Sequence, residues 1–333
     1  MRERIHVRVA DDLSAFAAFC GKPGFGADSV AAHRADDHLV ALDPQGAITA
    51  RCSLWWRCPP LLPGHRPGII GHYAAQSAAA GDALLKAACR CLAERGCTAA
   101  VGPMDGSTWR SYRLVTRTSR RPAFFLEPDL PPEWAGHFQV SGFKPLARYF
   151  SAMTGRLDQL PSAAPNPHGR LAARGIVLRP LDLEHLEAEL CRIYPLCRES
   201  FQDNLLFTPI PEEEFISMHR PLAQYLAPQL SWVAELEEDA IGFIFAVPDI
   251  LQARRGEPIS TVILKTVAVA PPFRGIGLGQ ALAAASQSAA IGSGYRDVIY
   301  ALIRAGNPSA RISAHYARPI RSYALFIKEM AKR

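Results

Sequence analysis

Residues 267–280 read VAVAPPFRGIGLGQ and constrain this chain more than any other stretch. Alternating valines predict a strand, and three alternating glycines stand before an alanine-rich run that predicts a helix. A helix N-terminus presents about four unpaired backbone N–H groups and a partial positive charge. Glycines let an anion approach that backbone, and Arg274 adds a planar donor fork suited to phosphate. The pattern therefore predicts a pyrophosphate cradle.

Two nucleotide-binding patterns do not fit this cradle. A Rossmann fingerprint reads G-x-G-x-x-G and needs an acidic residue at the end of the next strand. Here the glycines alternate, and the next predicted strand, residues 297–303, ends without a carboxylate. A Walker loop needs Gly-Lys-Ser/Thr, which is absent. The remaining alternative is a glycine-rich turn that binds no ligand.

The same stretch resembles the acyl-CoA-binding motif of the GNAT superfamily of N-acetyltransferases, V-x-V-x-P-x-x-R-G-x-G-x-G/A. Every diagnostic position of that motif is matched. The resemblance implies that the strand bonds the pantetheine arm, that the loop amides hold the CoA pyrophosphate, and that acetyl-CoA or another acyl-CoA is the co-substrate. The cofactor-binding residues that it implies are Val267, Ala268, Val269, Arg274, Gly275, Ile276, Gly277, Leu278, Gly279, Gln280 and Asn307.

Asn307 belongs to this set because residues 307–310 (NPSA) resemble the family's Asn-x-x-Ala helix start; simple capping of that helix is the alternative. In the family, a tyrosine seven residues after the Asn often protonates the departing thiolate. That position here is Ala314. Tyr316 is the nearest replacement for this catalytic acid and Tyr323, on the next strand, is the second candidate. A role in core packing is the alternative for both tyrosines.

The order of predicted elements indicates the fold class. Both halves read strand, helix, hairpin, strand, helix, strand, strand. We expect an α/β fold with two GNAT-like domains in tandem, each a mostly antiparallel sheet flanked by helices. We place a degenerate domain at residues 1–155, a polar, Pro-containing linker at 156–174, and the catalytic domain at 175–333.

The first half lacks a cradle of its own. SAAAGD (residues 77–82) stands where the Arg-Gly stretch would be, so we expect no CoA there. The segment GPMDGSTWRSYR (residues 102–113) resembles one in the N-terminal halves of tandem GNAT proteins. We expect this half to be a scaffold or part of an acceptor pocket, with Ser107 and Trp109 in a structural or pocket-lining role.

The implied chemistry is direct attack of a neutral amine on a thioester. A backbone N–H near Val267 would stabilise the developing oxyanion. The general base is open: Asp203, Glu212 to Glu214 and Glu235 are candidates, as is a chain of waters. The alternative for these carboxylates is simple solvation at the surface.

Composition restricts the partners. The formal charge of +6 is scattered, without a basic stripe interleaved with aromatics, so we expect no nucleic-acid partner. No apolar run reaches the ~20 residues of a membrane span, and no signal core is visible, so we expect a cytoplasmic protein with no membrane partner. The eight cysteines are expected to be reduced. The neighbours His33, Asp36, Asp37 and His38 are expected to cap a strand, and we expect no metal site.

The sequence therefore favours an acyl-CoA-dependent N-acyltransferase, with acetyl-CoA as the first choice of donor and a small amine or amino-acid-like metabolite as acceptor. The protein would be a monomer or homodimer. Two alternatives stay open. One is an acyltransferase whose acceptor is a protein or a carrier-bound group, and the other is a non-catalytic sensor that binds CoA only as a ligand.

Overall fold

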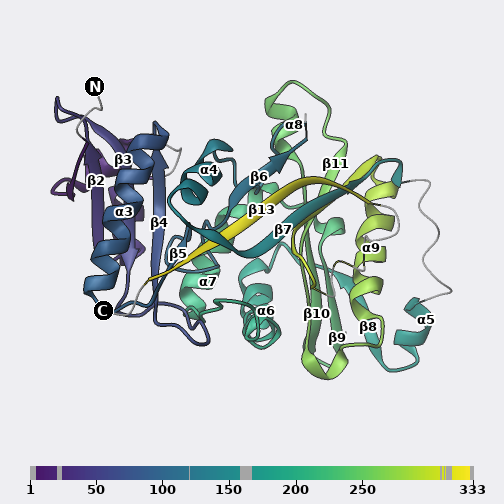
Figure 1. The fold of residues 1–333 in the computed structure, drawn as a ribbon. Coiled ribbons are helices and arrows are strands. Elements are labelled where there is room, and N and C mark those ends of the chain that lie inside the picture. Colours follow the sequence, from purple (N-terminus) through teal and green to yellow (C-terminus); the bar gives the residue numbers. More distant parts are fainter. Residues whose placement is uncertain are drawn as a thin grey trace.

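The computed structural model describes residues 5–20, 25–119, 121–157, 167–307, 310, 312 and 317–330. Its strands form one sheet with helices packed against both faces (Figure 1). The strands are β1 (His6–Val9), β2 (Asp37–Leu42), β3 (Ile48–Trp55), β4 (Pro67–Ala75), β5 (Ala99–Gly102), β6 (Leu114–Thr118), β7 (Lys144–Thr154), β8 (Ile176–Pro180), β9 (Trp232–Leu236), β10 (Asp239–Pro248), β11 (Thr261–Val269), β12 (Asp297–Arg304) and β13 (Arg318–Glu329).

The helices lie between these strands along the chain. The α-helices are α1 (Leu13–Ala18), α2 (Ala27–Ala32), α3 (Ala78–Glu94), α4 (Glu133–Val140), α5 (Pro167–Ala172), α6 (Leu186–Phe201), α7 (Glu212–His219), α8 (Ile250–Arg254) and α9 (Leu278–Gly292). The 3₁₀ segments given for the described residues are η2 (Arg220–Tyr225), η3 (Pro228–Leu230) and η4 (Pro271–Phe273).

The sheet has two similar ends joined in the middle. Its order is β1-β2-β3-β4-β5-β13-β7-β12-β11-β10-β9-β8, with β6 pairing to β13 beside this path. Most neighbours are antiparallel, but β4 and β5 are parallel, and so are β11 and β12. This mixed sheet confirms the α/β class and the mostly antiparallel pairing expected from the sequence.

The two halves exchange their closing strands. β7 ends the first half of the chain but pairs with β12 of the second, from Val298 opposite Thr154 to Arg304 opposite Tyr149. β13 ends the second half but pairs with β5 and β6 of the first. The two exchanged strands also pair with each other over nearly their whole length. Figure 1 shows β13 (yellow) crossing into the first half while β7 (teal) crosses into the second.

Helices cover both faces of each end of the sheet. In the first half, Leu84 and Leu92 of α3 pack in one core cluster with Leu54 of β3. In the second half, neighbouring residues of β10 face opposite ways: Ile244 joins the cluster under α9, and Phe243 joins the cluster under α6. Burying a side chain of this size stabilises the fold by roughly 1.5–3 kcal/mol, so these helices hold the sheet from both sides.

The closing strand expected in each half corresponds to β7 in the first half and to β13 in the second. The order of elements alone keeps each of these strands in its own half, whereas the structure exchanges them. The predicted linker contains α5 (Pro167–Ala172), while residues 158–166 lie outside the described part. The division at 156–174 stays a prediction, because the shared sheet crosses it.

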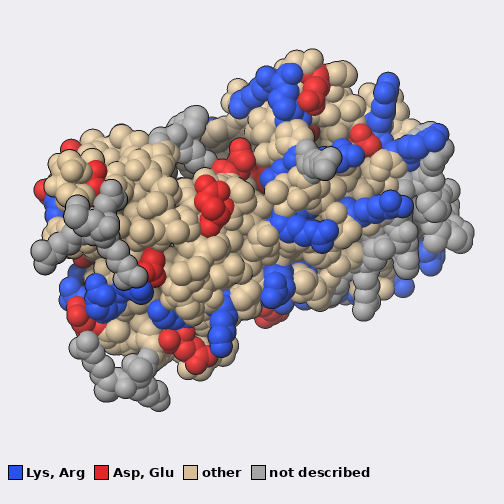
Figure 2. All heavy atoms as spheres, turned by 45° about the horizontal axis from the view of Figure 1, so that its top comes forward, with Lys and Arg blue, Asp and Glu red and all other residues tan. Residues whose placement is uncertain are grey.

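Charged residues are scattered over the face shown in Figure 2. Lys and Arg side chains appear there at several separate places, with uncharged surface between them. Among the described residues, we find no helix with both the length and the apolar character that a bilayer crossing requires.

The strand exchange predicts that the second half does not fold alone. Residues 156–333, expressed by themselves, would leave the β12 edge unpaired and remove every sheet partner of β13. Because open edges of this length aggregate, we expect no cooperative thermal transition by circular dichroism. Co-expression with residues 1–155 is expected to restore a one-to-one complex on size exclusion. A monomeric, cooperatively folding 156–333 fragment would contradict the exchange.

Candidate active site

The site begins where two parallel strands separate. β11 and β12 pair from Thr261 opposite Asp297 to Leu264 opposite Tyr300, and no further. Beyond that point β11 follows β10, and β12 follows β7. A bulge in the pairing of β10 with β11 falls at Lys265. The separation leaves one edge of each strand without a sheet partner at the middle of the fold.

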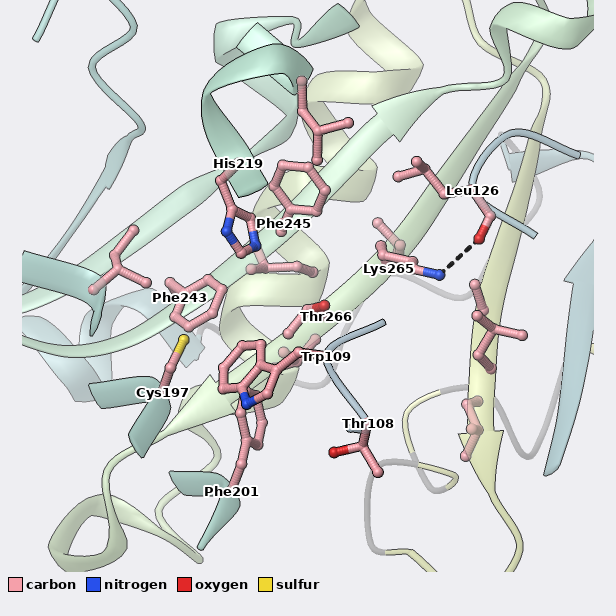
Figure 3. Close-up of a pocket in the computed structure, with 18 of the residues that line it drawn as sticks. Thr108, Trp109, Leu126, Cys197, Phe201, His219, Phe243, Phe245, Lys265 and Thr266 are labelled. Atoms are coloured by element: carbon pink, nitrogen blue, oxygen red, sulfur yellow. Dashed lines mark hydrogen bonds between the residues drawn. The ribbon is translucent and has the colours of Figure 1, made fainter. Parts of the chain in front are cut away.

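A cavity of about 640 Å³ opens at this separation. Lys265, Thr266 and Val267 of β11 line one part of it, and residues 301–304 of β12 line another. The first half of the chain contributes residues 108–113 and 126–128. Most of the remaining wall is apolar and comes from α6, α7 and β10, including Leu190, Cys197, Phe201, Phe215, Phe243 and Phe245 (Figure 3).

Lys265 is the cationic side chain of β11 that borders the cavity. Its Nζ donates a hydrogen bond of 2.9 Å to the carbonyl oxygen of Leu126, which belongs to the first half (Figure 3). Desolvation by the surrounding protein, helped by the charge of Arg113, lowers the pKa of Lys265 to about 7. Neutral and charged forms of this amine are therefore both populated near neutral pH.

His219 at the end of α7 is a second basic group of the cavity wall. Its Nδ1 lies 2.7 Å from the carbonyl oxygen of Phe215, so Nδ1 carries the proton and Nε2 holds the lone pair. Burial lowers the pKa of His219, which favours the neutral ring. The cavity wall thus presents two basic nitrogens, the amine of Lys265 on β11 and Nε2 of His219 on α7.

The loop from the first half is fastened to the second. Trp109 Nε1 donates a 2.8 Å hydrogen bond to the Thr208 carbonyl oxygen, and the indole ring packs against Phe207 and Phe215. Arg110 pairs with Glu214 at 2.6 Å. These contacts confirm that Trp109 lines the pocket, whereas Ser107 is buried and does not.

The glycine-rich stretch has the geometry of an open anion cradle. Gly275 and Gly277 have φ angles of +83° and +90°, and a Cβ added at either would meet no atom within 4 Å. Gly277 caps α9, whose first N–H groups have no acceptor within the helix. Helix N–H groups without an acceptor, next to glycines whose Cβ positions are open, suit a pyrophosphate, so these residues fit CoA.

Arg274 stands beside the cradle and is tied to the neighbouring helix. Its Nη2 donates to the Ser200 carbonyl oxygen at 3.1 Å, and its Nε donates to the Val269 carbonyl oxygen at 3.4 Å. The side chain is exposed, so its remaining N–H groups face solvent. Arg274 therefore fixes the loop against the end of α6 and adds positive charge at its rim.

The other predicted cofactor residues differ in where the structure places them. Val267 and Asn307 line the cavity, which brings the two ends of the predicted site together. Ala268 and Leu278 are buried in the clusters on the two faces of the sheet. A Cβ on Gly279 would touch Val267 and Val269 at 3.7 and 3.8 Å, so α9 starts close to β11. Ile276 is partly buried, and Gln280 is exposed.

The two predicted acid residues have different outcomes. Tyr316 lies outside the described residues. Tyr323 is 1% exposed and is not part of the cavity wall. Its hydroxyl bonds to the Glu127 carboxylate and lies 3.1 Å from Ser151 Oγ. Burial and the neighbouring Glu127 raise the pKa of Tyr323. Its packing is that of a core tyrosine, which is the alternative that the sequence left open for this residue.

The predicted carboxylate bases are engaged elsewhere or lie at the surface. Glu235 pairs with Arg179 at 2.6 Å and with Arg192 at 2.7 Å. Glu214 pairs with Arg110, and Asp203 is exposed. None of these three side chains is part of the cavity wall. Lys265 and His219 were not among the bases expected from the sequence, because their burial at the cavity follows from the fold and not from a local pattern.

The matching place in the first half is closed. Ser77 Oγ accepts from the Ala80 N–H at the start of α3. A Cβ on Gly81 would lie 2.3 Å from Tyr73 Oη and 2.9 Å from His137 Nδ1. Trp134 of α4 also bonds the carbonyl oxygen of Ala75, at the end of β4. The chain's own side chains therefore fill the space that the cradle leaves open in the second half.

Residues 190–313 match the family model described as the acetyltransferase (GNAT) family. This span includes the separated strands, the cradle and most of the cavity wall. The second half of the chain is therefore similar to the acetyltransferases of this family over the residues that the model matches.

Among curated proteins, the chain is similar to the bacterial ceramide synthase of Caulobacter vibrioides. The two are 26% identical over 191 residues, which is 57% of this chain and 50% of that protein. The chain thus matches only half the length of that relative.

Two solved structures have the same fold over nearly the whole chain. A GCN5-related N-acetyltransferase from Sphaerobacter thermophilus has a TM-score of 0.51 and 16% identity, covering 98% of this chain and 95% of that one. A tandem GNAT protein from the clavulanic acid biosynthesis pathway has a TM-score of 0.50 and 14% identity, covering 98% of both chains. At these identities the likeness concerns the fold alone.

The cradle predicts the effect of one substitution. Gly277→Glu is expected to weaken acetyl-CoA binding in calorimetry by at least about 100-fold, because two like charges about 4 Å apart cost about 4 kcal/mol near a protein surface. Gly294→Glu is the matched control, since Gly294 follows the other end of α9 with a φ of +83° and equally open space. Both variants bear similar backbone strain. Equal affinities in the two folded variants would refute the cradle.

Proposed function

We propose that this chain is an acyl-CoA-dependent N-acyltransferase whose acceptor is an amine with a long apolar chain. The observation that carries the proposal is the cavity, which joins the separation of β11 and β12 to an apolar wall built by both halves. This acceptor is larger and more apolar than the small metabolite expected from the sequence. The mostly apolar lining favours a hydrocarbon chain over a polar protein segment as the acceptor.

The cradle supports the choice of donor. The N–H groups at the start of α9, with Gly275 and Gly277 open above them, would hold the CoA pyrophosphate. When bound, acyl-CoA supplies an acyl group activated as a thioester. Acetyl-CoA remains the first donor to test, and a long-chain acyl-CoA is the second.

The apolar wall supports the choice of acceptor. In Figure 3, Cys197 and Phe243 lie to one side of Thr266, and Lys265 lies to the other. A hydrocarbon chain placed along the apolar side would leave its amine near β11 and Lys265. A ceramide is an amide of a long-chain amine, so the name of the Caulobacter relative is in keeping with such an acceptor.

Lys265 and the strand edge supply the chemical groups. An amine attacks only when neutral, and a neutral Lys265 near the separation accepts its proton. The backbone groups of β11 on the edge away from β10 provide donors for the charge that develops on the carbonyl oxygen. Tyr316 stays a predicted donor of the proton to the departing thiolate.

The decisive experiment is a thiol-release assay on the full chain, with acetyl-CoA or palmitoyl-CoA as donor and hexadecylamine or butylamine as acceptor. We expect faster release with hexadecylamine than with butylamine. Binding of acyl-CoA without release for either amine would replace the enzyme with a CoA-binding sensor. Faster thiol release with butylamine would contradict the long-chain acceptor and favour a small amine metabolite.

Lys265 predicts a pH dependence. Below a pKa of about 7 its ammonium has no lone pair, so kcat/KM should rise with pH through about 7. Lys265→Met should lower kcat/KM at pH 8 by about 100-fold and move the rise to the higher pH at which the substrate amine itself deprotonates. Lys144→Met, on the exposed lysine of β7, is the control and should keep the profile. An unshifted profile in Lys265→Met would point to His219 instead.

The cavity wall predicts a change in chain-length preference. Cys197 is 2% exposed on α6 and lines the cavity, whereas Cys191 on the same helix is exposed. Cys197→Phe should raise the KM for hexadecylamine about tenfold. The added ring would displace more than one CH₂ group of the amine's chain from the cavity, and burying each CH₂ contributes about 0.8 kcal/mol to binding. The KM for butylamine should hardly change, and Cys191→Phe should alter neither. Equal effects on both amines would show that the chain lies elsewhere.

A further inference from the structure

The first half of the chain contains a buried polar cluster that the acyl-transfer site does not use. It lies just beyond the point where β4 and β5 stop pairing, at Ile69 opposite Val101. His72 comes from β4, His33 from the end of α2, and Asp105 from the loop after β5. One ligand atom from each of these three side chains lies within 4.8 Å of the other two.

This grouping differs from the one visible in the sequence. The neighbours His33, Asp36, Asp37 and His38 were expected to cap a strand. Asp36 does accept the backbone N–H groups of Trp56 and Arg57. His33 points elsewhere, with its Nδ1 2.7 Å from His72 Nε2. The fold therefore brings His33 next to His72 and Asp105, which lie 39 and 72 positions further along the chain. Their spacing in the sequence does not reveal this grouping.

The backbone of His72 is held in an uncommon conformation. Its φ is +46°, a region that residues with a Cβ seldom adopt. Asp105 Oδ1 accepts the His72 N–H at 2.6 Å, and Arg51 Nη1 donates to the His72 carbonyl oxygen at 2.9 Å. Such conformations persist where the surroundings over-determine them, and they concentrate at functional sites. In this protein the positive φ and the two hydrogen bonds direct Nε2 of His72 toward His33.

The second ring nitrogen of His72 is also fixed. Its Nδ1 lies 2.8 Å from Ser53 Oγ, which in turn lies 2.7 Å from Nδ1 of His38. When Ser53 donates to His38, it accepts from the Nδ1–H of His72, and the lone pair of His72 is then on Nε2. Histidines that bind metals commonly donate their other N–H to such a neighbour.

The site is buried and lies close to positive charge, and desolvation is the main reason that the pKa of His72 is lowered to about 2 and that of His33 to about 4. Two cations stand close by, but Arg110 is paired with Glu214 at 2.6 Å. Arg51 lies over the rings of Phe16 and Phe25. Neutral nitrogens and one carboxylate form a ligand set that suits Zn²⁺.

We propose that His33, His72 and Asp105 bind one divalent transition-metal ion of the Zn²⁺ class. Two nitrogens on a tetrahedral ion with bonds of about 2.0–2.1 Å lie about 3.3 Å apart, so binding replaces the His33–His72 hydrogen bond by a small separation of the rings. His33 is half-buried at the end of a short helix, which leaves room for this shift.

The ion would join three segments that the fold already connects through the His33–His72 and His72–Asp105 hydrogen bonds. It connects the end of α2 and β4 with the loop that begins at Asp105 and continues to Trp109 and Arg110 in the wall of the acyl-transfer cavity. The site is therefore structural, and it acts on the cavity by ordering this loop. It does not depend on the proposed acceptor.

The test is a titration of the full chain, stripped with a chelator, with Zn²⁺ by calorimetry and with Co²⁺ by visible absorption. We expect one equivalent to bind, with Co²⁺ bands of a nitrogen- and oxygen-ligated site, and a Tm that rises by several degrees. No binding of either ion by the folded wild-type protein overturns the proposal.

Variants locate the ion. His33→Gln and Asp105→Asn should each weaken Zn²⁺ binding at least tenfold, and Asp105→Asn keeps an oxygen for the His72 N–H. His185→Gln is the control, because His185 and Asp182 form a His–carboxylate pair at the surface, 2.9 Å apart. Unchanged affinity in a folded Asp105→Asn variant, or a loss only in His185→Gln, refutes the site. Circular dichroism establishes that each variant is folded.

Discussion

The pairing of β7 with β13 is the interaction on which the rest of the structure depends. Each strand closes the sheet of the other half, so neither half has a complete sheet of its own. The exchange places the first half directly beside the separation of β11 and β12. Loop residues 108–113 and 126–128 reach the cavity from there. Without this pairing the cavity would lack one wall and Lys265 would lack its carbonyl partner, Leu126.

The same architecture is used twice with different results. In the second half, the parallel strands separate at an open cradle, and the space between them is a cavity with apolar walls. In the first half, α4 and Ser77 close the helix N-terminus, and the separation of β4 and β5 holds a compact group of histidines. One half has kept room for a large co-substrate, whereas the other has filled that room with its own side chains.

The sequence predicted the parts of this molecule whose signal is local. The motif around Arg274 and Gly277 identified the strand, the loop and the helix of the cradle, because glycine spacing is directly readable. The sequence shows that residue 265 is a lysine, but it does not show that the pKa of this lysine is lowered. The lowering arises from burial between the two halves of the chain, which no local pattern encodes. The strand exchange was not predictable for a related reason. β7 and β13 are far apart in the sequence, and their alternating side chains would be buried equally well whether each strand pairs within its own half or in the other half.

The exchange of closing strands also fixes the order in which the protein can be completed during its synthesis. The edge of β5 is made by residue 102, but its partner β13 begins at residue 318, which is 318 − 102 = 216 residues later. At about 5–20 residues per second, the edge waits roughly 10–45 seconds for its partner. β7 likewise waits for β12. The nascent chain therefore carries exposed strand edges from the emergence of β5 until β13 has left the exit tunnel.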